Sequence, residues 1–215
     1  MNLLPKGMLP AMVALLIVIT GVSFLVFKKS SPVSLPGGVV QSAPGSGFDG
    51  TLALPAKAAP PIDLRNYLGR RVTLAQYRGK VVFVTFLYTH CPDICPLIAS
   101  NLRVALNLLG KRAAGVQVIA ISVDPRGDTP ATVASFLQAH EMTGRMQYLI
   151  GSAAELGPTW AAWSVGSTRE AGSPDLVAPT ALVYGISAKG TLTTLYPDSF
   201  APEQIAHDVP VLASR

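Results

Sequence analysis

Residues Lys80 to Pro96 read KVVFVTFLYTHCPDICP, and this stretch sets both the fold and the location of the chemistry. Lys80 to Tyr88 is a continuous run of apolar, β-branched and aromatic side chains, typical of a strand that is buried on both faces. The residues that follow carry the only two cysteines of the chain, Cys91 and Cys95. Leu97 to Leu109 then shows apolar residues at helical spacing. The stretch predicts a central strand that leads through a thiol-bearing loop into a helix.

Strand and helix patterns alternate through the rest of this region. Expected strands are Val72 to Leu74, Val116 to Val123 and Met146 to Ile150, followed by a hairpin of Thr180 to Ile186 and Thr191 to Tyr196. Expected helices run from Pro130 (with Thr129 as N-cap) to about His140, from Ser152 (with Glu155 in a capping box) through Trp163, and from Ala201 to Leu212. This order predicts an α/β fold with a mixed central sheet. Functional groups in such sheets gather where a central strand ends, which here is the cysteine loop.

The N-terminal region predicts a membrane anchor. Leu9 to Phe27 contains no charged residue, and about 19 residues at 1.5 Å each span a hydrocarbon core of roughly 30 Å. A cleaved signal peptide has a shorter apolar region and a small-residue cleavage site, whereas Lys28 and Lys29 follow this run directly. An uncleaved anchor over residues 1–29 is therefore favoured over a signal peptide. Lys6 and the amino terminus nearly balance the two lysines, so the charges leave the orientation open.

Residues 30–59 are rich in Pro, Gly, Ser and Ala, a composition that buries too little apolar surface to fold. They are expected to form a flexible tether between the anchor and one folded domain over residues 60–215. The formal net charge is +5, but the basic residues are scattered and no Lys/Arg run with interleaved aromatics occurs. This distribution argues against nucleic-acid binding.

The spacing of the two cysteines points to joint chemistry. Two cysteines are too few for a disulfide scaffold, and a close pair indicates redox or metal chemistry. At positions i and i+4 of a helical turn, Cys91 and Cys95 would share one face, within reach of a disulfide or of one soft metal ion. The start of a helix also stabilises thiolates. The residues alone leave metal binding and disulfide exchange both open, beside the plain alternative of two buried core thiols.

Two segments carry a family resemblance. TFLYTHCPDICP (Thr85 to Pro96) and ISVDPRGDTP (Ile121 to Pro130) resemble the characteristic segments of the SCO/SenC family, and the similarity extends over most of Pro60 to Leu212. The resemblance implies a thioredoxin-like fold and a role in assembling the binuclear copper centre of cytochrome c oxidase. It implies copper ligation by Cys91, Cys95 and a distant histidine, and disulfide reduction by some members. It also implies an anchored domain on the extracytoplasmic side of a membrane.

The sequence departs from the family at that histidine. The matching segment, Val177 to Tyr184, reads VAPTALVY, and Pro179 occupies the histidine position. His90 belongs to the cysteine motif, and its ring is expected to leave the strand end in a different direction from the sulfurs. His140 and His207 are expected at the surface.

The missing imidazole bears on the metal. Two thiolates alone can hold soft Cu(I), whereas Cu(II) prefers tetragonal nitrogen and oxygen ligands, and zinc requires more ligands than are evident. Cu(I) is therefore the expected cofactor.

The leading hypothesis is a membrane-tethered factor that handles Cu(I) or reduces the thiols of a copper site. Its partner would be the copper-site subunit of cytochrome c oxidase or another thiol protein. The alternative is a general extracytoplasmic thiol–disulfide oxidoreductase, with Cys91 attacking and Cys95 resolving. Whether the protein is an enzyme stays open at this point. A peroxidase lacks a separate peroxidatic motif, and a redox-inactive relative is the remaining alternative.

Overall fold

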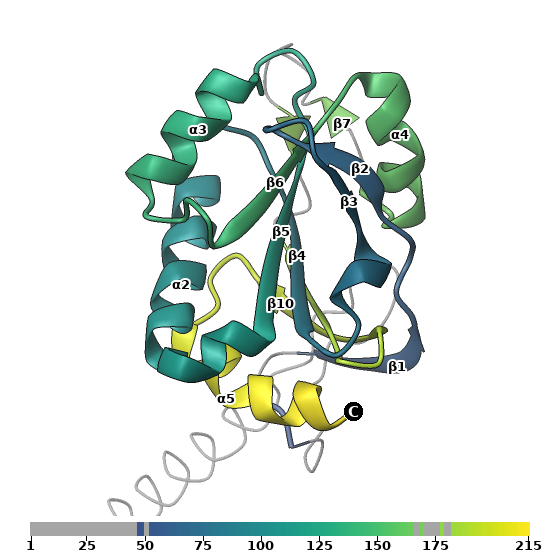
Figure 1. The fold of residues 1–215 in the computed structure, drawn as a ribbon, viewed down its shortest axis with the longest axis vertical. Coiled ribbons are helices and arrows are strands. Elements are labelled where there is room, and N and C mark those ends of the chain that lie inside the picture. Colours follow the sequence, from purple (N-terminus) through teal and green to yellow (C-terminus); the bar gives the residue numbers. More distant parts are fainter. Residues whose placement is uncertain (1–46, 50–51, 166–167, 170–176, 179–181) are drawn as a thin grey trace, which may run out of the picture. The chain divides into compact units, whose positions relative to one another are not determined.

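The computed structural model describes residues 47–49, 52–165, 168–169, 177–178 and 182–215 (Figure 1). The anchor predicted over residues 9–27 lies outside these ranges. Within them, no helix has the length and apolar character needed to cross a bilayer.

One mixed sheet organises the described residues. Its eight strands there follow the order β1 (Leu52–Ala58), β10 (Thr191–Pro197), β9 (Leu182–Ile186), β4 (Val81–Leu87), β5 (Val116–Ser122), β6 (Met146–Ile150), β2 (Asp63–Asn66) and β3 (Arg71–Thr73). The strands β4, β5 and β6 are parallel, and the other neighbours pair antiparallel. A short pair, β7 (Thr168–Arg169) and β8 (Val177–Ala178), stands apart. The expected α/β class and mixed sheet are confirmed.

Helices connect the parallel strands. The helices α2 (Ile94–Leu109) and α3 (Pro130–Ala139) lie on one side of the sheet and α4 (Ala153–Ala162) on the other, as Figure 1 shows. The helix α5 (Pro202–Ser214) closes the chain, and two short 3-10 helices, η1 (Leu74–Tyr77) and η2 (Gly110–Gly115), form turns. The predicted caps are present: Thr129 accepts from the Thr132 N–H at 3.2 Å, and Ser152 and Glu155 cap α4 reciprocally.

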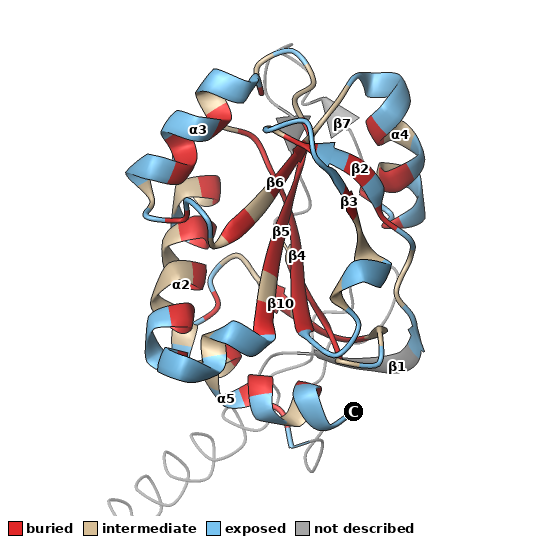
Figure 2. Ribbon diagram, viewed as in Figure 1, coloured by how far each residue is buried: buried red, intermediate tan, exposed pale blue. Residues whose placement is uncertain are grey.

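The strand β4 is the centre of the core, because all seven of its residues are buried between β5 and β9 (Figure 2). Phe86 extends from β4 into an aromatic cluster with Trp163 and Tyr184, whose ring centroids lie 5.1–6.1 Å from their neighbours. Phe83 makes an edge contact at 5.9 Å with Tyr196 of β10. This packing fixes the point at which β4 ends and the cysteine loop begins.

Several elements differ from the sequence expectation, among them strand β2, which was not expected. Helix α2 begins at Ile94, three residues earlier than the apolar spacing suggested, because the Asp93 carboxylate accepts the Ile94 N–H at 2.6 Å. Strand β1 lies inside the range expected for the tether and pairs with β10. The composition of the whole range is rich in proline, which obscured a short edge strand within it. Pro55 is tolerated there beside a break in register between Ala53 and Lys57.

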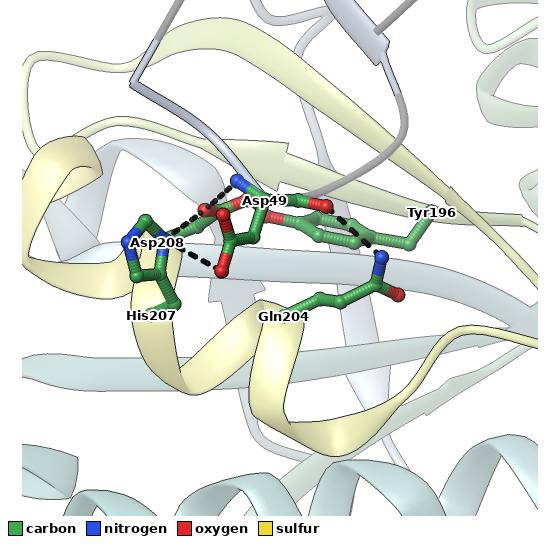
Figure 3. Close-up of polar contacts among 5 residues, drawn as sticks. All are labelled: Asp49, Tyr196, Gln204, His207 and Asp208. Atoms are coloured by element: carbon green, nitrogen blue, oxygen red, sulfur yellow. Dashed lines mark hydrogen bonds and ion pairs between the residues drawn. The ribbon is translucent and has the colours of Figure 1, made fainter.

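The segment before β1 is fastened to α5. We call residues 47–49 the N-terminal strap. Its Asp49 N–H donates to Asp208 Oδ1 at 2.7 Å, and its Asp49 carbonyl accepts from Gln204 Nε2 at 2.9 Å (Figure 3).

His207 Nδ1 lies 3.0 Å from Asp208 Oδ1 and 3.5 Å from Asp49 Oδ2. Asp208 is fully buried and also accepts from the Tyr196 hydroxyl at 2.9 Å. His207 therefore bridges two carboxylates, one from the strap and one from the helix.

This bridge makes the strap sensitive to pH. The hydrogen bond with Asp208, and then the charge of Asp49, raise the pKa of His207 above its ordinary value. A raised pKa means that the stabilisation is complete below about pH 6.5 and is lost as the pH rises through the folded value. We expect the melting temperature to fall between about pH 6 and pH 8, and to fall less in His207→Gln. The same slope in the variant would contradict this account.

Candidate thiol site

The cysteine loop joins the end of β4 to the start of α2. Cys91 is 8% exposed and Cys95 is 1% exposed, and both are free thiols. Cys91 lies before the Asp93 N-cap, whereas Cys95 occupies the first turn of α2. The Cys91 N–H donates to the Tyr88 carbonyl at 3.3 Å, which closes a tight turn directly after β4. The structure thus brings the two predicted site residues together at the entrance of the helix.

The first N–H groups of a helix lack partners within the helix and need acceptors from outside. At α2, Ile94 N–H donates to the Asp93 carboxylate, and Cys95 N–H donates to Cys91 Sγ at 3.3 Å. Pro96 follows and has no N–H, and Leu97 N–H already reaches the Asp93 carbonyl at 3.1 Å. The Cys91 sulfur therefore serves as a capping acceptor. N–H groups and the positive end of the helix dipole stabilise negative charge on sulfur at such a position.

The two thiols differ in environment. Burial raises the pKa of Cys95 well above its usual range, and the neighbouring Cys91 and Asp128 raise it further, against one backbone hydrogen bond that lowers it. Burial, followed by the Cys91 neighbour, also raises the pKa of Tyr88. Burial therefore disfavours the thiolate form of Cys95, and Cys91 is the more exposed of the two residues.

A buried carboxylate lies behind the loop. Asp128 is 4% exposed and accepts three hydrogen bonds: from Thr89 N–H at 2.8 Å, from Ser122 Oγ at 2.6 Å and from the Tyr148 hydroxyl at 3.0 Å. Burial and then the Asp128 charge raise the pKa of Tyr148. In the sequence, Asp128 stands only as the residue before the expected N-cap, Thr129. The one signal that could have identified it was an acidic residue in the second family-like segment.

The histidines do not join the sulfurs. His90 is exposed, its Nδ1 lies 3.2 Å from Thr89 Oγ1, and no hydrogen bond links it to a sulfur among the described residues. His140 is half-buried against Phe136 rather than on the surface, and burial lowers its pKa. His207 is exposed, as expected, and belongs to the strap contact. Pro179 lies outside the described residues, which contain no group of three or more His, Cys, Asp or Glu side chains able to hold a metal.

Several residues that flank Cys91 in the sequence are exposed to solvent. His90, Pro92, Asp93 and Leu97 are all exposed beside it, and Leu97 is a large apolar side chain at 45% exposure. A hollow next to the loop is lined by Thr89, His90, Ala131, Thr132, Ser135, Phe136 and Ala139. Cys91 therefore lies just below a surface with apolar and polar contact points.

The SCO1/SenC family model matches residues 51–214, which include the strands, the cysteine loop and the Asp128 segment. The chain belongs to the SCO1/SenC family. The resemblance of the two quoted segments is thereby confirmed.

Individual SCO1/SenC proteins support this placement. The chain is 29% identical over 162 residues to Protein SenC of Rhodobacter capsulatus, covering 74% of this chain and 72% of that protein. It is 30% identical over 151 residues to the mitochondrial Protein SCO2 homolog of Bos taurus, covering 68% of this chain but only 56% of the bovine protein.

A solved structure agrees with the fold. ScoI of Bradyrhizobium japonicum, solved with copper bound, superposes with a TM-score of 0.64 at 30% identity, covering 73% of this chain and 99% of that one. The thioredoxin-like α/β fold that the resemblance implied is thus confirmed for the SCO1/SenC domain.

The difference between the two thiols yields a labelling prediction. In brief treatment with iodoacetamide near pH 7.5, Cys91 should be alkylated at least about tenfold faster than Cys95, because a thiolate is the reactive form and burial of Cys95 disfavours its thiolate. Peptide mass spectrometry of the folded protein measures both rates. The matched variants are Cys91→Ser and Cys95→Ser, of which the first should label slowly. Faster labelling of Cys95 would contradict the assignment.

Proposed function

We propose that this SCO1/SenC protein carries Cu(I) on Cys91 and Cys95 during assembly of the copper centre of cytochrome c oxidase. The observation that supports the proposal most is the contact of Cys95 N–H with Cys91 Sγ, which sets the two cysteines side by side. Two thiolates form a soft ligand pair that suits Cu(I). The copper-bound ScoI relative supports the same metal. Copper is the cargo, and the cysteine loop is its carrier.

The ligand set favours Cu(I) over other metals. Binding requires the loss of both thiol protons, and a bound cation supplies the attraction that makes ionisation of buried Cys95 favourable. Pro179 stands where the family resemblance implies a histidine, so no imidazole is offered from that position. Cu(II) prefers nitrogen and oxygen donors and should bind weakly. The carrier is therefore expected to be selective for the reduced ion.

The proposed setting is a membrane surface outside the cytoplasm. We propose that residues 9–27 anchor the chain, that the following Pro/Gly/Ser-rich residues form a tether, and that the domain faces the extracytoplasmic side. The proposed recipient is the copper-site subunit of the oxidase, whose thiolate ligands would receive Cu(I) from Cys91. Exposed Leu97 and Pro92 would form part of the contact surface for that partner.

Anaerobic titration of the purified protein with Cu(I) tests the proposal. We expect one copper per chain, with affinity lowered by at least about a hundredfold in Cys91→Ser and in Cys95→Ser, because each variant removes one of two ligands. His90→Ala is the matched control and should bind as the wild type does. Tight stoichiometric Cu(II) binding, or Cu(I) binding that survives loss of either cysteine, would refute the proposal.

One observation favours a second candidate, thiol–disulfide exchange. Exchange requires one more accessible attacking thiol and one buried resolving thiol, and Cys91 is more exposed than Cys95, whose pKa is raised by burial. The Cys91 thiolate would attack a partner disulfide and release one partner thiolate. The Cys95 sulfur, after losing its proton, would then attack Cys91 and release the second, leaving the Cys91–Cys95 disulfide and a reduced partner. Cys95→Ser should trap the mixed disulfide with a model disulfide, and Cys91→Ser should not.

A further inference from the structure

Asp128 is the feature of the described residues that the proposed copper chemistry does not by itself explain. A carboxylate buried to this degree destabilises the fold unless it is paired or fully hydrogen-bonded. None of the ion pairs among the described residues includes Asp128. Its oxygens instead accept three neutral donors, from Thr89, Ser122 and Tyr148. A neutral side chain at this position would avoid the cost of the buried charge. We therefore ask what the carboxylate does.

The three donors come from different parts of the fold. Ser122 ends β5 and Tyr148 lies in β6, so these two hydroxyls fix the carboxylate to the sheet. The Asp128 backbone is also fixed, because its N–H donates to the Asp124 carbonyl at 3.0 Å and the next residue, Thr129, caps α3. Contacts with β5, β6 and the start of α3 therefore hold the Asp128 carboxylate in a fixed position.

The third donor connects this rigid acceptor to the thiols. Thr89 N–H lies two residues before Cys91, within the turn that the Cys91 N–H closes on the Tyr88 carbonyl. A shift of Thr89 would move that turn and carry Cys91 Sγ away from the Cys95 N–H. Hydrogen bonds to a charged acceptor are stronger than those between neutral groups. A carboxylate holds this amide more firmly than a neutral acceptor would.

We propose that Asp128 is a positioning residue for the thiol pair: its carboxylate holds the Thr89 amide and thereby keeps the Cys91 sulfur over the first turn of α2. This inference rests on the proposed copper function, whose ligands it places. Asp128 is not one of the proposed copper ligands, and its contact with the loop is the hydrogen bond from the Thr89 backbone. Preorganisation of this kind lowers the cost of bringing two ligands onto one ion.

The test compares two variants of the full chain that act on the same carboxylate. Asp128→Asn keeps the size of the side chain but removes its charge. Tyr148→Phe removes one of the three donors and leaves the Thr89 contact intact, because Ser122 Oγ and the Asp128 backbone still hold the carboxylate. Two quantities are measured: Cu(I) affinity by competition with a chelator of known affinity, and the equilibrium constant of the Cys91–Cys95 dithiol against dithiothreitol.

Asp128→Asn should weaken Cu(I) binding by about tenfold or more and shift the dithiol equilibrium by about fivefold, as expected for loss of a supporting contact behind a ligand. Tyr148→Phe should stay within about twofold of the wild type in both measurements, even if it melts at a lower temperature. Equal shifts in the two variants, or wild-type values in Asp128→Asn, would overturn the inference.

Two further readouts separate this inference from the proposed function and from misfolding. If the wild type binds no Cu(I), the copper proposal fails, and the dithiol equilibrium still tests the positioning role. If Asp128→Asn does not fold, hydrogen exchange of the wild-type Thr89 amide decides. Strong protection supports the contact, and exchange at the rate of an open loop overturns it.

Discussion

The structure of the thiol site depends on one requirement, that the first N–H groups of helix α2 find acceptors. Helix α2 starts shortly after the end of the central strand, and the contact made by its Cys95 N–H is buried, so water cannot serve this donor. Asp93 and Cys91 supply acceptors, and Pro96 removes one donor altogether. The same contacts that allow the helix to start here set the Cys91 sulfur above the first turn that contains Cys95. Local folding and the proposed metal chemistry thus rest on the same few atoms.

The core around β4 makes this requirement strict. Because β4 is buried along its whole length between β5 and β9, its end cannot move without disturbing the aromatic packing of Phe86. On the far side of the loop, α2 is held by its own buried residues, which include Ile98 and Leu102. The loop between them is short, and the Asp128 carboxylate binds its backbone from behind. Such a loop can present sulfur in one arrangement, which suits a carrier that exchanges a metal without refolding.

The sequence predicted the features that local patterns encode. The buried strands followed from β-branched runs, and the starts of α3 and α4 followed from Thr129 and Ser152. The early start of α2 was missed because it depends on an acidic cap and a sulfur acceptor rather than on apolar spacing. Strand β1 was missed because its partner, β10, lies about 140 residues away along the chain. The Thr89–Asp128 contact and the Asp49–Asp208 contact of the strap were missed for the same reason, since each joins residues far apart in sequence.

The central claim is that two sulfurs at one helix entrance act together on one soft ion. Copper K-edge X-ray absorption of the Cu(I)-loaded, full-length protein tests it most directly, because the method counts sulfur ligands around the metal. The account predicts two sulfur scatterers per copper in the wild type and one in Cys95→Ser. A wild-type spectrum with a single sulfur, or one dominated by nitrogen and oxygen ligands, would contradict it.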